Sequence, residues 1–138
     1  MIIINGENKI LGRLCSFVAK QLLLGENVVI VNCEKILVKK KPKIAFEKYL
    51  NMIHRGDPYK GPFVSRRPDF LVKRTIRGML PWKTNRGREA FKRLKCYISV
   101  PEEFKNTHFT EINNAKYDRN YTAISLKEIC KRIGYRGE

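Results

Sequence analysis

The residues in this sequence that can do the most chemistry are basic, and they concentrate in its middle. Residues 39–95 hold 18 of the 29 Lys and Arg residues of the 138-residue chain, but only 4 of its 13 Asp and Glu residues. Arginine binds phosphate through paired hydrogen bonds and stacks on bases, whereas lysine acts as a point charge. Repulsion among so many like charges lowers the stability of the folded protein unless a bound polyanion relieves it. The pattern therefore predicts nucleic acid as the partner, with an anionic membrane surface as the alternative.

Helical spacing gathers part of this charge on one side of a helix predicted over Phe70–Leu80. Lys73, Arg74 and Arg77 share that side, and the opposite side carries Val72, Ile76, Met79 and Leu80. The like-charged pair Lys73 and Arg77 destabilises an isolated helix, which is tolerable where the side meets phosphates. Phe70 lies on the basic side and can stack on a base or ribose. The alternative is a solvated basic face with Phe70 packed against a neighbouring element.

Further basic residues follow prolines, glycines and the aromatic residues Tyr59, Phe63 and Trp82. Charged, irregular segments with interleaved aromatics suit a folded RNA, which proteins meet by shape, phosphate contacts and stacking. Proteins that recognise duplex DNA usually present one recognition helix, whereas the basic residues here spread over loops and several predicted helices. A DNA-binding protein is therefore the weaker alternative. Trp82 suits packing beneath the surface equally well. The predicted RNA contacts are Arg13, Lys39, Lys40, Lys41, Lys43, Lys60, Arg66, Arg67, Lys73, Arg74, Arg77, Lys83, Arg86, Arg88, Lys92 and Arg93.

The hypothesis that the protein is an enzyme has little support in the sequence. The segment Gly6–Arg13 stands where a phosphate loop would be, but it lacks the Gly-Lys-Ser/Thr ending, so a turn and helix start is favoured. The two histidines, His54 and His108, have no Cys or carboxylate at metal-ligand spacing, and CxxC is absent. We therefore expect no catalytic residue, metal or cofactor. An RNA-processing enzyme that uses the Gly6–Arg13 loop remains the alternative.

The elements that must position these side chains begin with a βαβ unit. The apolar run Met1–Asn5 predicts a buried strand, helical spacing over Leu11–Leu22 predicts a helix that Gly25 ends, and Asn27–Asn32 predicts a second strand. A strand, a helix of this length and a strand imply a right-handed crossover between parallel strands. The remaining predicted elements are a turn and short strand over Cys33–Val38, a helix from Ile44 to Ile53, a loop over Arg55–Arg67, a helix over Arg86–Leu94, a strand over Lys95–Val100 and a helix that Ser125 caps.

Length and composition predict one domain over residues 1–138, with a polar C-terminal extension over about 101–138. The apolar runs are far shorter than the roughly 18–20 residues that a membrane span needs, and we expect no secretory signal. The four cysteines, Cys15, Cys33, Cys96 and Cys130, lie far apart among apolar or helix-forming residues. We therefore predict buried thiols in a reducing compartment, not a disulfide framework.

Several motifs resemble the L13 family of large-subunit ribosomal proteins, and three point to its archaeal and eukaryotic branch. The general motifs are LGRL at Leu11–Leu14, VNCEK at Val31–Lys35 and GMLP at Gly78–Pro81, and the branch motifs are RRPD at Arg66–Asp69, RTIRG at Arg74–Gly78 and KTNRG at Lys83–Gly87. The resemblance covers about residues 1–100. The chain has Asn5-Gly6 where the family usually has Asp-Ala, and Cys33 where it usually has Ala.

The resemblance implies an α/β fold with three layers, α/β/α, around a small, mostly parallel sheet of about four strands. It also implies a non-enzymatic structural constituent of the large ribosomal subunit that binds rRNA and helps to fold and stabilise it during assembly. The partners that it implies are large-subunit rRNA and neighbouring ribosomal proteins, with no membrane and no small-molecule substrate. The expected location is cytoplasmic and ribosome-bound.

Overall fold

A parallel three-stranded sheet forms the centre of the computed structural model, which describes residues 1–61, 63–117 and 122–135. Strands β1 (Ile2–Asn5), β2 (Val28–Val31) and β4 (Leu94–Cys96) lie in the order β1-β2-β4. The helix α1 (Leu11–Leu23) connects the first two strands, so the predicted βαβ unit is confirmed. The α/β fold class that the sequence and the resemblance predict is confirmed as well.

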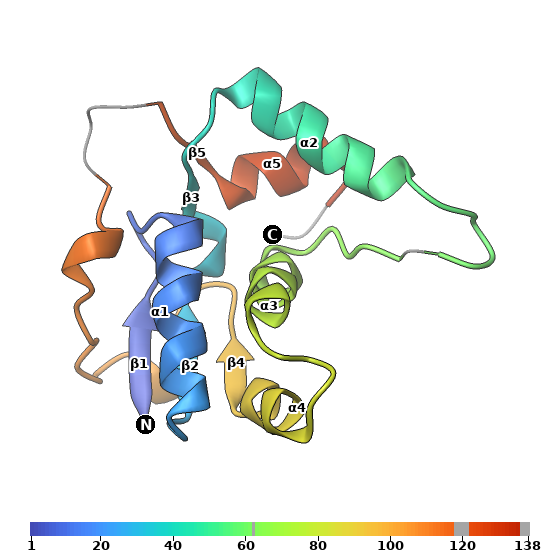
Figure 1. Cartoon of the computed structure of the whole chain (residues 1–138). Helices are drawn as coiled ribbons and strands as arrows, with labels where there is room; N and C mark the ends of the chain where they lie inside the picture. The colour runs from blue at the N-terminus through green and yellow to red at the C-terminus, as the bar shows by residue number, and fades with distance from the viewer. Residues whose placement is uncertain (62, 118–121, 136–138) are drawn as a thin grey trace.

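The two faces of this sheet bury alternate side chains, as the period of a strand requires. Ile4, Val28 and Ile30 belong to the main core with the buried side of α1, whereas Ile3, Val29 and Val31 face a second, smaller cluster. Helices α3 (Pro68–Met79) and α4 (Asn85–Lys92) lie beside α1 (Figure 1). The smaller cluster is covered by Tyr97, Val100, Phe104 and Phe109, around the short 3-10 helix η2 (Glu102–Phe104).

A second group of elements packs at one end of the sheet. Strands β3 (Leu37–Val38) and β5 (Ile124–Ser125) form an antiparallel pair, and α2 (Pro42–His54) lies beside α5 (Leu126–Arg132) (Figure 1). The Ser125 hydroxyl accepts a hydrogen bond from the Glu128 N–H at 3.5 Å, so the predicted cap of α5 is confirmed. Two further 3-10 helices, η1 (Cys33–Lys35) and η3 (Asn113–Ala115), complete the described elements.

The structure corrects three details of the sequence prediction. The helix predicted over Arg86–Leu94 ends at Lys92, and Leu94 instead begins β4, because it pairs with Val28. That strand ends at Cys96 and does not reach Val100, since Ser99 takes a left-handed backbone conformation that breaks an extended chain. Met79, placed on the apolar side of its helix, is 42% exposed, because α3 ends there and its last turn projects beyond the core.

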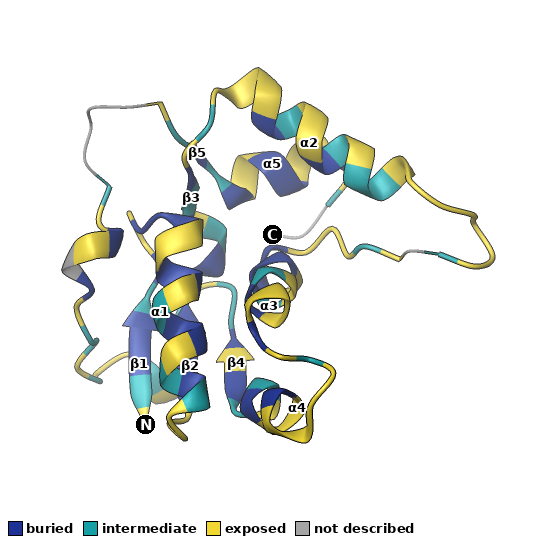
Figure 2. Ribbon diagram, viewed as in Figure 1, coloured by how far each residue is buried: buried dark blue, intermediate teal, exposed yellow. Residues whose placement is uncertain are grey.

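Burial is strongest in the sheet and α1 and weakest in the middle of the chain, as Figure 2 shows. All four cysteines are buried and free, as predicted. Burial raises the pKa of the Cys15 thiol, and raises that of Cys130 to about 12. The pKa of Cys33 is raised by its contact with Cys96 and by burial. Among the described residues, no helix is long and apolar enough to cross a membrane.

Candidate nucleic-acid interface

The helix α3 separates its apolar and basic residues as the spacing predicts. Pro68 occupies the first turn, where its missing N–H costs no hydrogen bond, and fixes where the helix begins. Leu71, Val72 and Ile76 are buried against the core, with α1 as the main neighbour of α3. Arg74 and Arg77 are exposed on the other side, and Lys73 is half-buried. Packing of one face therefore orients the cations of the other face outward.

Phe70 lies on this basic side between two cations. The Arg67 guanidinium is 4.9 Å from the ring centroid and the Lys73 ammonium is 5.8 Å from it. Phe70 is 42% exposed, so it is not tucked into a neighbouring element. Arg67 also forms an ion pair with the largely buried carboxylate of Asp69, at 3.2 Å. This pair and the aromatic contact hold the guanidinium beside an accessible ring.

Trp82 joins α3 to α4 and has the packing role predicted for it, while its stacking on nucleic acid stays a prediction. Its ring meets Phe91 edge-on, with centroids 5.2 Å apart, and the Arg77 guanidinium lies 4.3 Å above it. The Arg88 side chain donates a hydrogen bond from Nε to the Trp82 carbonyl oxygen at 3.1 Å. Trp82 is half-buried, so it anchors two arginines while part of the ring stays accessible. A hollow of about 560 Å³ opens here, lined by Arg74, Arg77, Gly78, Leu80, Trp82 and Lys83.

The segment between α2 and α3 projects from the body as an extended arm (Figure 1). The backbones of Asp57 and Gly61 exchange hydrogen bonds of 3.0 and 2.8 Å, and the Tyr59 N–H donates to Asp57 Oδ1 at 2.9 Å. This turn presents Tyr59, 91% exposed, next to the exposed Lys60. Phe63 is 73% exposed. The arm therefore offers aromatic rings and cations to an outside partner.

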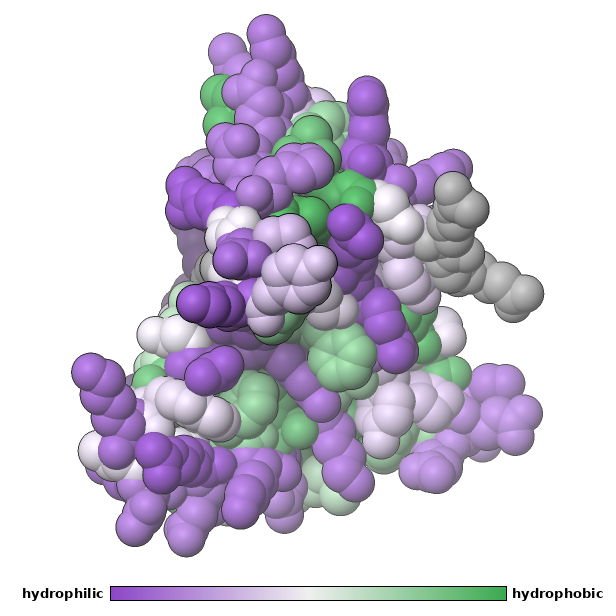
Figure 3. Space-filling view, turned by 90° about the vertical axis from the view of Figure 1, so that its right-hand side faces the viewer, coloured by the Kyte–Doolittle hydropathy of each residue, from purple (hydrophilic) through white to green (hydrophobic). Residues whose placement is uncertain are grey.

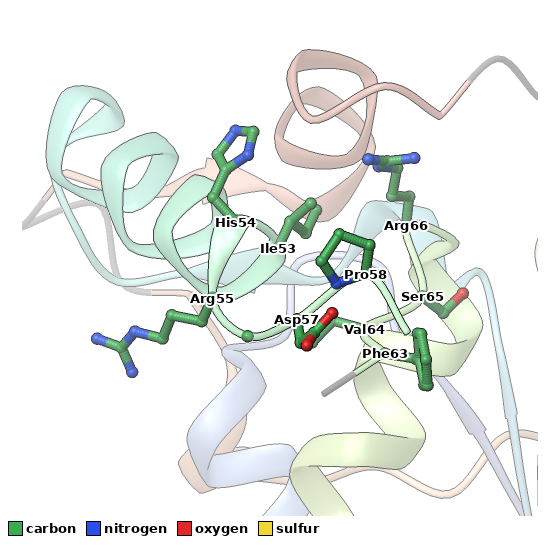
Figure 4. Close-up of a pocket in the computed structure, with 10 residues that line it drawn as sticks. Ile53, His54, Arg55, Asp57, Pro58, Phe63, Val64, Ser65 and Arg66 are labelled. Carbon is green, nitrogen blue, oxygen red and sulfur yellow. The ribbon is translucent and has the colours of Figure 1, made fainter. Parts of the chain in front are cut away.

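A second hollow, of about 600 Å³, lies between the end of α2 and the arm (Figure 4). Arg55, Arg66 and Phe63 line it together with the end of α2 around His54. Arg55 is an exposed cation that the sequence-based list left out. Its signal was its place in the same Gly- and Pro-containing basic segment as Lys60, although it directly follows a helix. Lys95, exposed on β4, was omitted in the same way.

The basic run before α2 is mostly exposed. Lys39, Lys41 and Lys43 are exposed, whereas Lys40 is half-buried. Burial and the neighbouring Lys40 lower the pKa of Lys48. The charge of Lys40 thus disfavours the charge of Lys48, a repulsion that a bound polyanion would relieve.

Besides Arg67 and Arg88, three more predicted contacts have hydrogen-bond partners inside the protein. Arg93 donates from Nη2 to the Leu22 carbonyl oxygen at 2.6 Å, and Arg86 donates from Nη2 to that of Leu23 at 3.3 Å. Both arginines therefore bind the last carbonyl groups of α1, which have no partner within the helix and favour positive charge. Arg13 donates from Nη1 to the Asn114 carbonyl oxygen at 3.2 Å. Arg86 and Arg13 remain exposed, whereas Arg93 is half-buried.

Acidic residues do little to neutralise the basic region, which we define as residues 39–95. Leaving Lys39 aside, Arg67–Asp69 is its one ion pair within the part of the chain that the structure describes. Thirteen of the sixteen predicted contacts are exposed, the exceptions being Lys40, Lys73 and Arg93. Figure 3 views the molecule from the side of the arm, and hydrophilic side chains cover most of it. Most of this positive charge therefore has no acidic partner among the described residues.

The Gly6–Arg13 loop forms its hydrogen bonds inside the protein. The Gly6 N–H donates to the Val31 carbonyl oxygen at 2.9 Å, and the Ile10 N–H donates to that of Ala115 at 2.8 Å. A Cβ on Gly6 would lie 2.6 Å from Cγ1 of Ile36, so close packing explains this glycine. The described residues also contain no group of three or more His, Cys, Asp or Glu side chains that could hold a metal.

The structure thus combines an α/β fold with exposed positive charge over residues 39–95 that acidic residues leave almost unpaired, features typical of proteins that bind nucleic acid. Comparison with known proteins is more specific. Residues 1–103 match the family described as Ribosomal protein L13, and the chain belongs to that family. The family assignment confirms the resemblance that the motifs indicate.

Curated relatives extend the match along nearly the whole chain. The large ribosomal subunit protein uL13 of Methanococcus maripaludis is 46% identical, over 97% of this chain and 98% of its own length. Those of Methanopyrus kandleri and Archaeoglobus fulgidus are 44% and 41% identical, over 97% and 98% of this chain and 87% and 88% of theirs. These names describe ribosomal proteins and no enzyme, in agreement with the prediction. The relatives also cover most of the C-terminal extension, beyond the end of the family match at residue 103.

Proposed function

We propose that this chain is a structural constituent of the large ribosomal subunit that binds rRNA through its basic region and helps to fold and stabilise it during assembly. The observation that carries the proposal is the exposed charge of residues 39–95, which the described acidic residues leave almost unpaired. A phosphate backbone supplies the missing counterions, and its binding releases condensed cations. The names of the relatives place those proteins in the large subunit, which supports the same location for this chain.

RNA fits this surface better than duplex DNA does. The cations lie on the arm and on two helices, together with the exposed rings of Tyr59, Phe63 and Phe70. Unpaired and splayed nucleotides offer base faces to such rings, whereas the stacked bases of a duplex do not. The proposed setting is a single domain over residues 1–138, ribosome-bound in the cytoplasm, with neighbouring ribosomal proteins as further partners.

The decisive variant removes two exposed cations of α3 together, Arg74→Ala with Arg77→Ala. We expect rRNA affinity to fall at least about tenfold, and the slope of log affinity against log salt to flatten by about two phosphate contacts. The matched control, Lys105→Ala with Lys127→Ala, removes the same charge from exposed positions outside the basic region. Filter binding with transcribed large-subunit rRNA measures both, and circular dichroism checks the fold. Equal loss in both double variants would count against the proposal.

Three further measurements separate the alternative functions. Affinity for duplex DNA at the same salt concentration should be much weaker than for rRNA, whereas a DNA-binding protein would bind both alike. In a gradient of cell extract, the chain should migrate with large subunits and stay there after a wash at moderate salt. Release at low salt would indicate loose electrostatic attachment and contradict the proposal. Turnover of RNA or nucleotide by the pure protein would support the enzymatic alternative.

A further inference from the structure

We infer that an RNA strand packs against the last turn of α3 at Gly78, with its phosphates on the surrounding cations and a ribose 2′-hydroxyl donating to the free carbonyl groups of that turn. This inference rests on the proposed function and specifies one subsite of it. It begins from a glycine that the fold itself does not require.

Gly78 has no structural reason to be glycine. It lies inside α3 and is not among the residues of positive φ, so any side chain can adopt its conformation. A Cβ built on it would meet nothing within 4 Å, so close packing does not exclude a side chain either. Glycine inside a helix is less favourable than alanine. Close approach of an outside partner to the backbone is the remaining physical reason for glycine at this position.

The surroundings of Gly78 identify the chemistry of that partner. Gly78 lines the hollow of about 560 Å³ together with Arg74, Arg77 and Lys83. Three cations around a bare stretch of backbone suit successive phosphates of a polyanion. Trp82 and the Arg77 guanidinium, 4.3 Å from its ring, form one wall of the hollow. That stacking holds the guanidinium in one orientation, so less conformational freedom is lost on binding.

The end of α3 also distinguishes RNA from DNA. The last carbonyl groups of a helix have no partner within it. Here the Leu80 N–H donates to the Arg77 carbonyl oxygen, and the Trp82 N–H donates to the Leu80 carbonyl oxygen. The carbonyl oxygens of Gly78 and Met79, which lie between these two acceptors, accept no hydrogen bond from any described residue. A phosphate would be repelled by these oxygens, but a ribose 2′-hydroxyl can donate to them. An RNA strand with phosphates on the cations and a ribose over Gly78 supplies both the negative charge for the cations and the hydrogen-bond donor for the carbonyl oxygens.

The test enlarges Gly78 without altering charge. Gly78→Ala should lower the affinity for transcribed large-subunit rRNA by about tenfold, near the upper end of what one hydrogen bond between neutral groups contributes, and Gly78→Leu should lower it further. The thermal unfolding temperature of Gly78→Ala should stay the same or rise, because alanine restricts the unfolded chain. Asn106→Leu is the control for added bulk, since Asn106 is exposed and lies outside the basic region.

Interference mapping with 2′-deoxynucleotides locates the ribose. In the wild type, one or a few 2′-deoxy positions in the rRNA should weaken binding, and the same positions should lose their effect in Gly78→Ala. Wild-type affinity in Gly78→Leu, or an equal loss in Asn106→Leu, overturns the inference while leaving rRNA binding itself intact. Normal rRNA affinity combined with failure to enter the subunit would assign the hollow to a protein neighbour and also overturn it. Absence of rRNA binding by the wild type would instead refute the proposed function.

Discussion

The first 38 residues and the basic region differ in where their side chains find partners. Residues 1–38 carry four basic and three acidic residues, and β1, α1 and β2 bury their apolar side chains in two clusters. Residues 39–95 carry 18 basic and four acidic residues, and most of their cations end in solvent. The side chains of the first region find most of their packing partners inside the protein. The second has favourable contacts still to make, which is the physical basis for assigning it a polyanionic partner.

The boundary between these two roles runs along helix faces and not only along the sequence. In α3, Ile76 is buried in the main core, while the next residue, Arg77, lies outside against Trp82. In α4, Ala90 is buried and Lys92 is exposed. Each helix therefore belongs to the core on one side and to the candidate interface on the other. Variants can test the two sides separately.

The largest effect is expected in the core. Leu14 is fully buried on the inner face of α1, and Leu14→Ala should lower the free energy of unfolding by about 2–5 kcal/mol through lost transfer energy and a cavity. Urea denaturation measures this, with the exposed neighbour Ser16→Ala, expected within about 0.5 kcal/mol of wild type, as its control. The rRNA affinity of the protein that remains folded should not change. A loss of affinity without a loss of stability would break the comparison.

A smaller effect separates two adjacent cations. Arg93→Met should lower the free energy of unfolding by about 1.5–3 kcal/mol, because the half-buried guanidinium donates to the Leu22 carbonyl oxygen at 2.6 Å. Its rRNA affinity should stay close to that of the wild type. Lys92→Met, at an exposed position, should lower the rRNA affinity and leave the free energy of unfolding nearly unchanged. Urea denaturation and filter binding on both variants decide the matter, and the opposite pattern would return Arg93 to the interface.

Arg93 shows why the candidate site was less predictable than the fold. Periodicity is a local signal, and it located β1, α1 and β2 because burial of one face dictates the pattern. The contact from Arg93 to Leu22 spans 71 positions, so no local pattern reports it. A sequence shows that a residue is basic, but it does not show which carbonyl group, ring or phosphate the charge will meet.

The short strand β5 escaped prediction for a related reason. It has two residues, Ile124 and Ser125, and exists because it pairs with β3 from far earlier in the chain. By contrast, the buried cysteines and the cap of α5 depend on neighbouring residues and were predicted correctly. Local patterns thus predicted most of the scaffold, whereas long-range pairing and the internal partners of the arginines required the structure.

A further prediction concerns the aromatic tip of the arm. Tyr59→Leu should lower rRNA affinity about fivefold or more, near the lower end of what base stacking on an aromatic ring contributes. The salt slope should stay unchanged because no charge is lost. Tyr59→Phe keeps the ring and should bind nearly as the wild type does. Filter binding across a salt series measures both properties, and a flatter slope in Tyr59→Leu would contradict stacking. Stability should be unaffected, because Tyr59 is 91% exposed.

The last effect appears only in alkaline solution and concerns the buried side of α2. Burial raises the pKa of Tyr49 to about 12 from its usual value near 10. Between these values the unfolded chain loses the phenol proton and the folded chain keeps it. The free energy of unfolding must therefore fall as pH rises from 10 to 12. The raised pKa of Cys130, about 12, acts in the same direction from about pH 9.

Tyr49→Phe isolates the phenol from the thiols. At pH 7 both states hold the proton, so the variant should differ from the wild type only by the small change in packing. Above pH 10 its free energy of unfolding should decline less steeply, while the decline that begins near pH 9 persists because Cys130 and the other buried thiols remain. Urea denaturation at intervals from pH 7 to pH 11 measures both slopes. Equal slopes above pH 10 would show that Tyr49 ionises as readily in the folded protein as in the unfolded chain. Its burial would then not distinguish it from an exposed group of the basic region.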